Sequence, residues 1–374
     1  MSVILSRQSR RRICFSLLVG VGFVAATPTT PVAARSAEPP AAVEDGYDLW
    51  LRYRPVKRTA PLNEYRAVLE RLVVQGTSPT LDAARDELER GIRGMLGVPV
   101  ALATTVSKTG TLIVGTPKSS PIIASLPLAA WLEKVGDEGY VVRSLTVRGN
   151  RITVVTGNTD VGVLHGAFYL LRRMQMEASI ANLGGQSAPR IKLRMLDHWD
   201  NLDRSVERGY AGKSLWDWST LPDSLPQRYR DYARANASIG INGVSITNVN
   251  ANARTLTTEY LRKAAALAGV FRPYGIKTYL TARFSAPIEI GGLKTADPLD
   301  SAVRAWWKNK ADEIYALIPD FGGFVVKANS EGQPGPQDYK RTHADGANML
   351  ADAVGPHGGI VMWRAFVYSN EVPT

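Results

Sequence analysis

The chain has 374 residues, of which 45% are hydrophobic and 21% are charged, and its formal net charge is +11. This composition is ordinary for a globular protein, and the length allows two or three domains with large cores. The basic excess is not arranged in Lys/Arg stripes interleaved with aromatic residues, so we do not expect nucleic-acid binding.

Residues 1–34 have the pattern of an export signal. The basic stretch RQSRRR is followed by the apolar run ICFSLLVGVGFVAA and by small residues that end in TPVAA. This run is shorter than the ~20 residues that span a bilayer, so we expect cleavage after Ala34 and no membrane anchor. Cys14 is the only cysteine, so no disulfide framework is expected. Residues 35–45 are predicted to be a linker, and the expected location is periplasmic or extracellular.

Residues 46–187 are predicted to form an amino-terminal α/β or α+β domain. Helical spacing of apolar residues predicts helices at 65–76, 80–97 and 160–175. A buried strand is predicted at 111–117, and two strands joined by a Gly-Asn turn are predicted within 139–159.

Residues 190–374 alternate between strand and helix patterns, which predicts parallel strands with right-handed crossovers. The predicted strands are 192–199, 243–250, 277–284, 323–330 and 359–368, and the helix patterns are 228–240, 258–275, 303–318 and 347–355. A closed (β/α)8 barrel has eight strands in about 250 residues. The pattern therefore fits either an open five-stranded sheet or a partial barrel of about five βα units.

Polar and aromatic residues gather where these predicted strands end. They are Asp197, His198 and Trp199; Thr247, Asn248 and Asn250; Arg283; Lys327, Asn329 and Glu331; and Arg364 and Tyr368. Parallel α/β folds carry their active sites at the carboxyl ends of the strands. Packing alone does not explain five such ends in succession, so a functional site is predicted there.

Glu331 is the candidate proton donor, because a carboxyl group beside bulky apolar residues would have a raised pKa. The alternative is a carboxylate in a salt bridge with Lys327 or Arg341. Lys327 and Arg364 could clamp an anion or could be solvated charges. Trp199 suits a sugar-binding platform, although a lone tryptophan is more often part of a core. No histidines have zinc spacing and no glycine-rich phosphate loop follows a strand, so no metal or cofactor is expected.

Two long segments, 194–218 and 319–354, resemble the α-glucuronidases of glycoside hydrolase family 67. The segments SAPIEIGGLKTADPLD (285–300) and WRAFVY (363–368) agree in order and spacing. Weaker likeness extends back to 47–56 and 165–175, so the resemblance covers nearly all of the chain after the signal.

The resemblance implies an amino-terminal α/β domain, a central (β/α)8 barrel and a carboxyl-terminal helical domain that usually forms a homodimer. It also implies release of α-1,2-linked 4-O-methyl-D-glucuronic acid from small xylo-oligosaccharides, with inversion and without a metal or nucleotide. Residue by residue, it implies the general acid at Glu331, an aromatic wall at Trp199, sugar- and carboxylate-binding cations at Lys327 and Arg364, and pocket-lining positions at Asp197 and Val249.

An inverting mechanism also needs a second carboxylate, roughly 6.5–9.5 Å from the acid. In the family, the candidate bases lie on later barrel strands than those of this chain. We therefore expect this polypeptide by itself to be inactive. With strands six to eight missing, strands one and five would be unpaired edges, so we also expect poor solubility. One hypothesis is that the chain is the amino-terminal portion of an exported α-glucuronidase, and the alternative is a non-catalytic carbohydrate-binding remnant or pseudoenzyme. An in-frame continuation after codon 374 with more βα units would support the first, and a stop codon would support the second.

Overall fold

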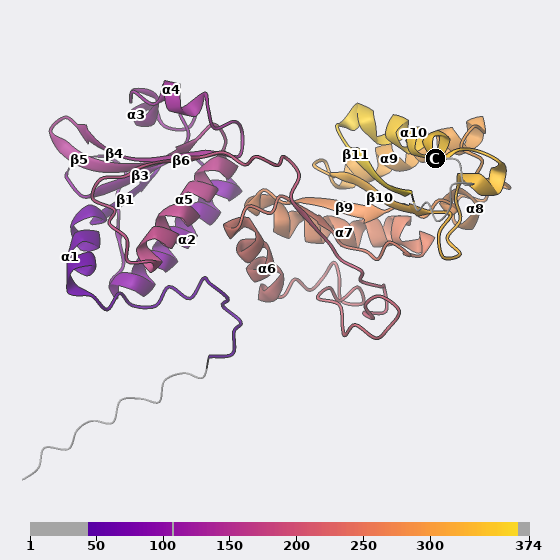
Figure 1. Ribbon diagram of the computed structural model, residues 1–374, viewed down its shortest axis with the longest axis horizontal. Helices are drawn as coiled ribbons and strands as arrows, with labels where there is room; N and C mark the ends of the chain where they lie inside the picture. Colours follow the sequence, from indigo (N-terminus) through magenta and orange to yellow (C-terminus); the bar gives the residue numbers. More distant parts are fainter. Residues whose placement is uncertain (1–43, 107, 366–374) are drawn as a thin grey trace, which may run out of the picture. The chain divides into compact units, whose positions relative to one another are not determined.

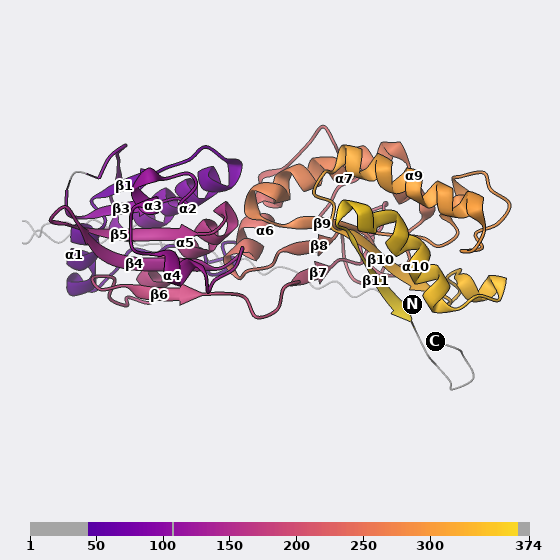
Figure 2. The same cartoon turned by 90° about the horizontal axis from the view of Figure 1, so that it is seen from above.

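The computed structural model describes residues 44–106 and 108–365, and all of its helices and strands lie in one compact unit that begins at Asp48. The predicted export signal and Tyr368 fall outside the described residues. The elements form two sheets with their helices (Figures 1 and 2). In the described part of the chain, no helix combines the length and hydropathy needed to cross a bilayer.

The first sheet has six strands in the order β2-β1-β3-β5-β4-β6. They are β1 (Arg71–Val74), β2 (Ala101–Leu102), β3 (Thr111–Val114), β4 (Tyr140–Val147), β5 (Asn150–Gly157) and β6 (Gly184–Ser187). Its helices are α1 (Thr59–Val68), α2 (Pro79–Leu96), α3 (Pro121–Ala124), α4 (Ala129–Leu132) and α5 (Asp160–Gln175). The predicted helices at 80–97 and 160–175, the strand at 111–117 and the antiparallel pair β4–β5 are confirmed.

Both faces of this sheet are covered by helices. Successive side chains along its strands therefore pack alternately into two cores. Figure 1 shows α2 and α5 side by side on one face and the short α3 and α4 on the other. On β3, Leu112 and Val114 pack with α2 and α5, whereas Ile113 packs with α3 and α4. The sheet is therefore a buried layer, and its hydrophobic runs follow from burial on both sides.

The predicted helix at 65–76 is wrong. Helix α1 ends at Val68, and β1 begins at Arg71. Leu72 and Val73 lie in the cores on opposite faces of the sheet, and this period-2 alternation outweighs the helical spacing that the same apolar residues suggested. The β4–β5 turn also differs: its central residues are Arg148 and Gly149, with φ of 49° and 79°, as a type I′ turn requires.

The second sheet has five parallel strands in the order β11-β10-β9-β8-β7, so every strand pairs with its neighbours in sequence and β7 and β11 form the edges. They are β7 (Met195–Asp197), β8 (Gly243–Ser245), β9 (Lys277–Thr281), β10 (Gly323–Ala328) and β11 (Ile360–Ala365). The helices are α6 (Gln227–Ser238), α7 (Thr258–Phe271), α8 (Ala286–Glu289), α9 (Ser301–Leu317) and α10 (His343–Val354). The 3-10 helices are η1 (Ala253–Leu256), η2 (Arg272–Tyr274), η3 (Pro336–Tyr339) and η4 (Gly355–His357). All five strands are found where predicted. The strands β7 to β10 end earlier than predicted, because their polar tails are loops.

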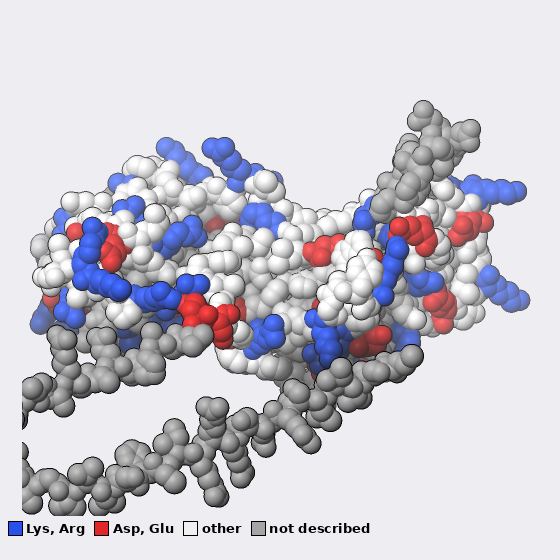
Figure 3. Space-filling model, turned by 60° about the horizontal axis from the view of Figure 1, so that its bottom comes forward, with Lys and Arg blue, Asp and Glu red and all other residues white. Residues whose placement is uncertain are grey.

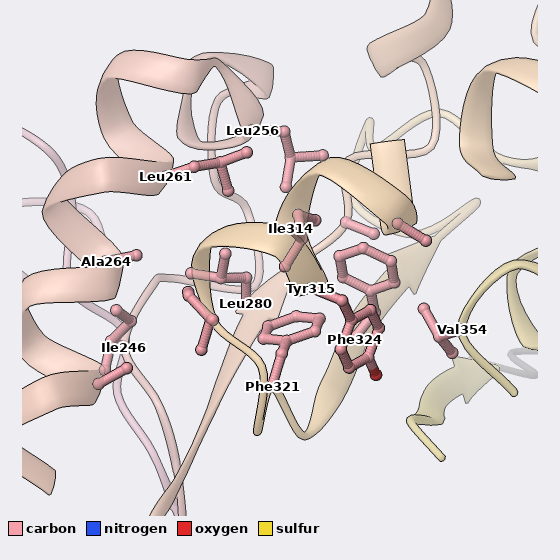
Figure 4. Packing of buried hydrophobic residues seen from close by; sticks show 14 of the residues in the cluster. Ile246, Leu256, Leu261, Ala264, Leu280, Ile314, Tyr315, Phe321, Phe324 and Val354 are labelled. Carbon is pink, nitrogen blue, oxygen red and sulfur yellow. The ribbon is translucent and has the colours of Figure 1, made fainter. Parts of the chain in front are cut away.

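Helices α7, α9 and α10 bury aliphatic and aromatic side chains against this sheet (Figure 4). The rings of Phe321 and Phe324 lie 5.4 Å apart, and Phe321 meets Tyr315 of α9 at 5.5 Å. Trp307, also on α9, is fully buried in the same core. This core fixes β10, the strand that leads to Glu331.

Gly322 and Gly323 lie at the start of β10, where the β11 backbone and the Tyr279 ring approach too closely to leave room for a Cβ atom. A Cβ on Gly323, whose φ is +129°, would lie 1.9 Å from the Ile360 carbonyl oxygen of β11. A Cβ on Gly322 would lie 2.2 Å from the Tyr279 ring. The GG pair before the apolar run is therefore a packing requirement of the sheet.

We expect Gly323→Ala to lower the free energy of unfolding by about 2 kcal/mol or more, because it adds a clash to a backbone conformation that disfavours Cβ. Urea unfolding measures the loss. The control is Gly269→Ala in α7, where a Cβ meets nothing within 4 Å and helix propensity favours alanine. Equal stability of the two variants would contradict the prediction.

A buried ion pair joins α2 to α6. Arg234 Nε donates to Glu87 Oε2 at 2.5 Å, and the Tyr53 hydroxyl donates to Glu87 Oε1 at 2.5 Å. The side chains of Glu87 and Arg234 are 3% and 8% exposed. Burial and the adjacent Glu87 carboxylate raise the pKa of Tyr53 far above its usual range. Each charge therefore depends on its partner to offset the loss of water.

We expect Arg234→Met to lower the free energy of unfolding by about 3 kcal/mol, because it leaves the Glu87 charge buried without its cation. The double variant Glu87→Leu/Arg234→Met should recover part of this loss. Arg85→Met is the control, since it breaks the exposed pairs with Asp82 and Asp86 and should cost less than about 1 kcal/mol. A cost for Arg234→Met no larger than for Arg85→Met would refute the prediction.

Candidate active site

The carboxyl ends of β7 to β11 lie at one edge of the second sheet, because all five strands are parallel. Asp197 is the last residue of β7, and the loops that leave this edge carry Trp199 after β7, Val249 after β8 and Glu331 after β10. Lys327 and Arg364 lie within β10 and β11 themselves. The candidate residues therefore come from four of the five strands and their loops.

Lys327 and Arg364 are register partners in the β10–β11 pair. Partners in adjacent strands project to the same face of a sheet, with the strands only about 4.8 Å apart. Two cations in this position repel each other unless an anion lies beside them. The sheet thus places two positive charges side by side at its carboxyl end, which suits a carboxylate ligand.

A sharp turn after β10 brings Glu331 back to Lys327. Asn329 and Glu331 both have φ of 48°, the left-handed region that side chains other than glycine seldom adopt. Asn329 holds this turn: its Oδ1 accepts from the Gln337 amide at 2.9 Å, and its Nδ2 donates to Asp338 Oδ1 at 3.0 Å. As a result, Lys327 Nζ donates to Glu331 Oε2 at 2.5 Å.

The electrostatics of Glu331 differ from the expectation of a raised pKa. The hydrogen bond and the charge of Lys327, together with Arg208, lower the pKa of Glu331 below its usual value. The expectation assumed burial, but the Glu331 side chain is 51% exposed, so the cations outweigh the loss of water. The alternative of a salt bridge with Lys327 is what the structure shows. Arg341 instead binds Asp297 at 2.9 Å.

Trp199 connects the first strand of the sheet to the last. Its Nε1 donates to Asp197 Oδ2 at 3.3 Å, and the Arg364 guanidinium lies 5.5 Å from the centre of its ring. The ring is partly exposed rather than buried in a core. Since β7 and β11 are opposite edges of the sheet, the cation–π contact shows that the sheet curves until the loop after β7 reaches Arg364 on the opposite edge strand.

Val249 is buried, with 2% of its surface exposed, in the loop after β8. Its neighbour Asn248 donates to Asn201 Oδ1 at 3.0 Å, which ties this loop to the one after β7. Contact between Val249 and a sugar stays a prediction. A cavity of about 300 Å³ lies beside these loops, lined by Asp200, Asn201, Leu202, Asp203, Asn250, Ala251, Asn252, Arg254 and Thr255. None of the six predicted site residues lines it.

The sequence reasoning gave no role to Glu207 and Arg208, which the structure brings to the site. Arg208 Nη2 donates to Glu331 Oε2 at 3.1 Å, and Arg208 Nε lies 3.3 Å from Glu207 Oε1. Glu207 and Arg208 lie in the loop after β7, which is closed by bridges of Asp200 with Val206 and of Ser205 with Lys213. Arg208 is 123 residues from Glu331, and only the fold brings them together.

Comparisons with known proteins identify the family of this chain. Family models match two parts of the chain: the glycosyl hydrolase family 67 N-terminus at residues 49–170 and the family 67 middle domain at residues 173–373. Alpha-glucuronidase A of Emericella nidulans is 39% identical over 346 residues, and a probable alpha-glucuronidase A of Neosartorya fischeri is 40% identical over 336 residues. These matches cover 88% and 89% of this chain, which spans 39% of the length of either relative.

A solved family GH115 4-O-methyl-alpha-glucuronidase with specificity for decorated arabinogalactans has a similar fold. Its TM-score is 0.52 at 14% identity, and the match covers 77% of this chain and 39% of that one. At this identity the likeness concerns the fold alone. The two family models together account for nearly all of the described residues, and the chain belongs to glycosyl hydrolase family 67.

Proposed function

We propose that this chain is part of an α-glucuronidase that releases α-1,2-linked (4-O-methyl)-D-glucuronic acid from xylo-oligosaccharides during xylan breakdown. The observation that carries the proposal is the register pair of Lys327 and Arg364, with the Glu331 carboxyl group bound to Lys327. This places two cations for an acidic sugar beside one group that can donate a proton. The relatives named alpha-glucuronidase support the same activity.

In the proposed reaction, the sugar carboxylate lies between Lys327 and Arg364, and Trp199 packs against the sugar ring. Glu331, once protonated, donates its proton to the oxygen that joins the uronic acid to xylose. The bond between this oxygen and the anomeric carbon then breaks through an oxocarbenium-like transition state. Protonation of the leaving oxygen matters because an alkoxide of xylose is a poor leaving group.

Inversion requires a water molecule on the opposite face of the sugar and a second carboxylate to take its proton, roughly 6.5–9.5 Å from Glu331. Following the family resemblance, we assign this base to later strands of a (β/α)8 barrel in which β7 to β11 are the first five. We also propose export through residues 1–34 and a homodimer formed by a carboxyl-terminal helical domain.

The role of Glu331 is tested with Glu331→Ala in the full-length protein. Turnover of a methylglucuronyl xylo-oligosaccharide should fall by a factor on the order of 10²–10⁴, because general-acid catalysis is lost. Turnover of an aryl glucuronide with an activated leaving group should fall far less, since that group needs little protonation. Glu259→Ala, which removes an exposed carboxylate of α7, should leave both rates unchanged.

Equal loss on the two substrates would remove Glu331 from the role of acid. Binding of the uronic acid without hydrolysis of either substrate by the unaltered full-length protein would identify the alternative, a non-catalytic carbohydrate-binding protein.

The role of Trp199 is tested by measuring the affinity of the full-length protein for D-glucuronate. Trp199→Ala should weaken binding about tenfold, because it removes the apolar wall and the surface beside which Arg364 is held. The matched control is Trp131→Ala, which removes another partly buried tryptophan with an arginine, Arg143, 4.0 Å from its ring centre. Calorimetry should give an unchanged dissociation constant for the control. Equal affinities for the two variants would contradict the assignment.

A further inference from the structure

Glu331 receives two cations on one carboxylate oxygen. Lys327 Nζ and Arg208 Nη2 lie 2.5 Å and 3.1 Å from the same Oε2. Lys327 comes from β10, and Arg208 comes from the loop after β7. A carboxylate held in this way is stabilised as an anion, whereas a general acid has to carry a proton before it can act.

Other charges around the turn are already paired with groups of their own. Gln333, two residues after Glu331, accepts from Arg283 at 2.9 Å, and Arg283 in turn binds Glu289 of α8 at 2.5 Å. Asp338 of η3 accepts from the Asn329 side chain and from the Gly335 amide. The charged groups that act on Glu331 are therefore Lys327 and Arg208, and these two cations also account for its lowered pKa.

A uronic acid would change this balance, because its carboxylate competes for the same cations. Lys327 and Arg364 are register partners, so an anion that binds both has to share Lys327 with Glu331. The added negative charge also lies close to Glu331. Both effects favour the protonated form of Glu331. A neutral hexose would produce neither effect.

Arg208 has a second acceptor to which it can turn. Glu207 Oε1 already lies 3.3 Å from Arg208 Nε, and Glu207 Oε2 is buried without a hydrogen-bond partner among the described residues. The Glu207 side chain is 12% exposed, whereas Arg208 is 59% exposed and has room to move. The guanidinium can therefore leave Glu331 without losing a carboxylate partner.

We propose that Arg208 is a positioning residue for Glu331, which together with Lys327 keeps the Glu331 carboxylate ionised before a sugar binds. When a hexuronic acid binds, the carboxylate of the sugar takes Lys327 and Arg208 turns to Glu207. Glu331 then takes up a proton. The proton comes from solvent, resides on a Glu331 oxygen and passes to the glycosidic oxygen as the bond to the sugar breaks. The inference rests on the proposed function. Its consequence is that only the binding of an acidic sugar converts Glu331 to the protonated form that can act as the acid.

The sign of the pH effect follows from the two states of Glu331. The pKa of Glu331 lies below the usual value when Lys327 and Arg208 bind it. We expect this pKa to rise when the uronate takes Lys327, because the carboxylate then loses a cation. Between these two pKa values, binding takes up a proton, so affinity increases as the pH falls through this window. The effect should decrease as the pH rises above this window, because Glu331 is then ionised with or without the sugar.

The experiment is calorimetry of D-glucuronate binding to the full-length protein at about pH 5, in two buffers with different ionisation enthalpies, since ordinary glutamates titrate near this pH. We expect net uptake of up to one proton per bound glucuronate, and none with methyl glucoside. Glu331→Gln should abolish the uptake. Arg208→Gln should reduce it by roughly half, because Glu331 is then partly protonated before the sugar binds.

Two controls separate this device from a structural role of the arginine. Arg208→Lys keeps a cation and should restore most of the uptake. Arg262→Gln removes an exposed arginine of α7 and should behave like the unaltered chain. Urea unfolding should give equal midpoints for Arg208→Gln, Arg208→Lys, Arg262→Gln and the unaltered protein, since the Arg208 and Arg262 side chains are largely exposed.

The outcomes separate the inference from the proposed function. Binding of glucuronate without proton uptake would overturn the inference and leave the function standing. Uptake that is the same in Arg208→Gln as in the unaltered chain would remove Arg208 from the device. No binding of glucuronate at any pH between about 4.5 and 7 would overturn the proposed function as well.

Discussion

The buried ammonium of Lys327 is the constraint on which the site depends. Its side chain is 2% exposed, and a charge removed from water to this extent needs an anionic partner nearby. Glu331 supplies this charge only because the chain turns sharply after β10, through residues whose backbone angles are otherwise unusual. The hydrogen bonds of Asn329 offset the strain at this turn. The turn in this way holds the Glu331 carboxylate beside Lys327.

The same constraint explains why the first and last strands of the sheet contribute together. The loop after β7 brings Arg208 to Glu331 and Trp199 to Arg364, so a single loop contacts both the carboxylate and the second cation. Figure 3 shows one face of the molecule, on which acidic and basic side chains are interspersed rather than gathered in one basic stripe. The paired cations at the strand ends are therefore not explained by a general basic surface. Lys327 and Arg364 lie side by side because they are register partners in β10 and β11.

The sequence predicted the parts of this structure that depend on local pattern. Five apolar runs gave the five parallel strands, and the polar residues at their ends gave Lys327, Glu331, Trp199 and Arg364 as neighbours. The pattern failed at β1, because Leu72 and Val73 satisfy helix and strand spacing alike until the two cores are known. The sequence left the direction of the Glu331 pKa shift open between burial and a salt bridge with Lys327. Lys327 lowers the pKa, with help from Arg208, and this outcome depends on the exposure of Glu331, which the sequence does not reveal.

The pairing of Lys327 with Arg364 has a consequence for how this part of the gene can change. Successive residues of a strand point to opposite faces, so removing one codon between Ile360 and Arg364 would exchange Arg364 for its neighbour opposite Lys327. Point substitutions can adjust the sugar pocket one group at a time. A change in the length of β11 instead alters which residue lies opposite Lys327. Insertions and deletions are therefore expected in the loops that flank the strand and not within it.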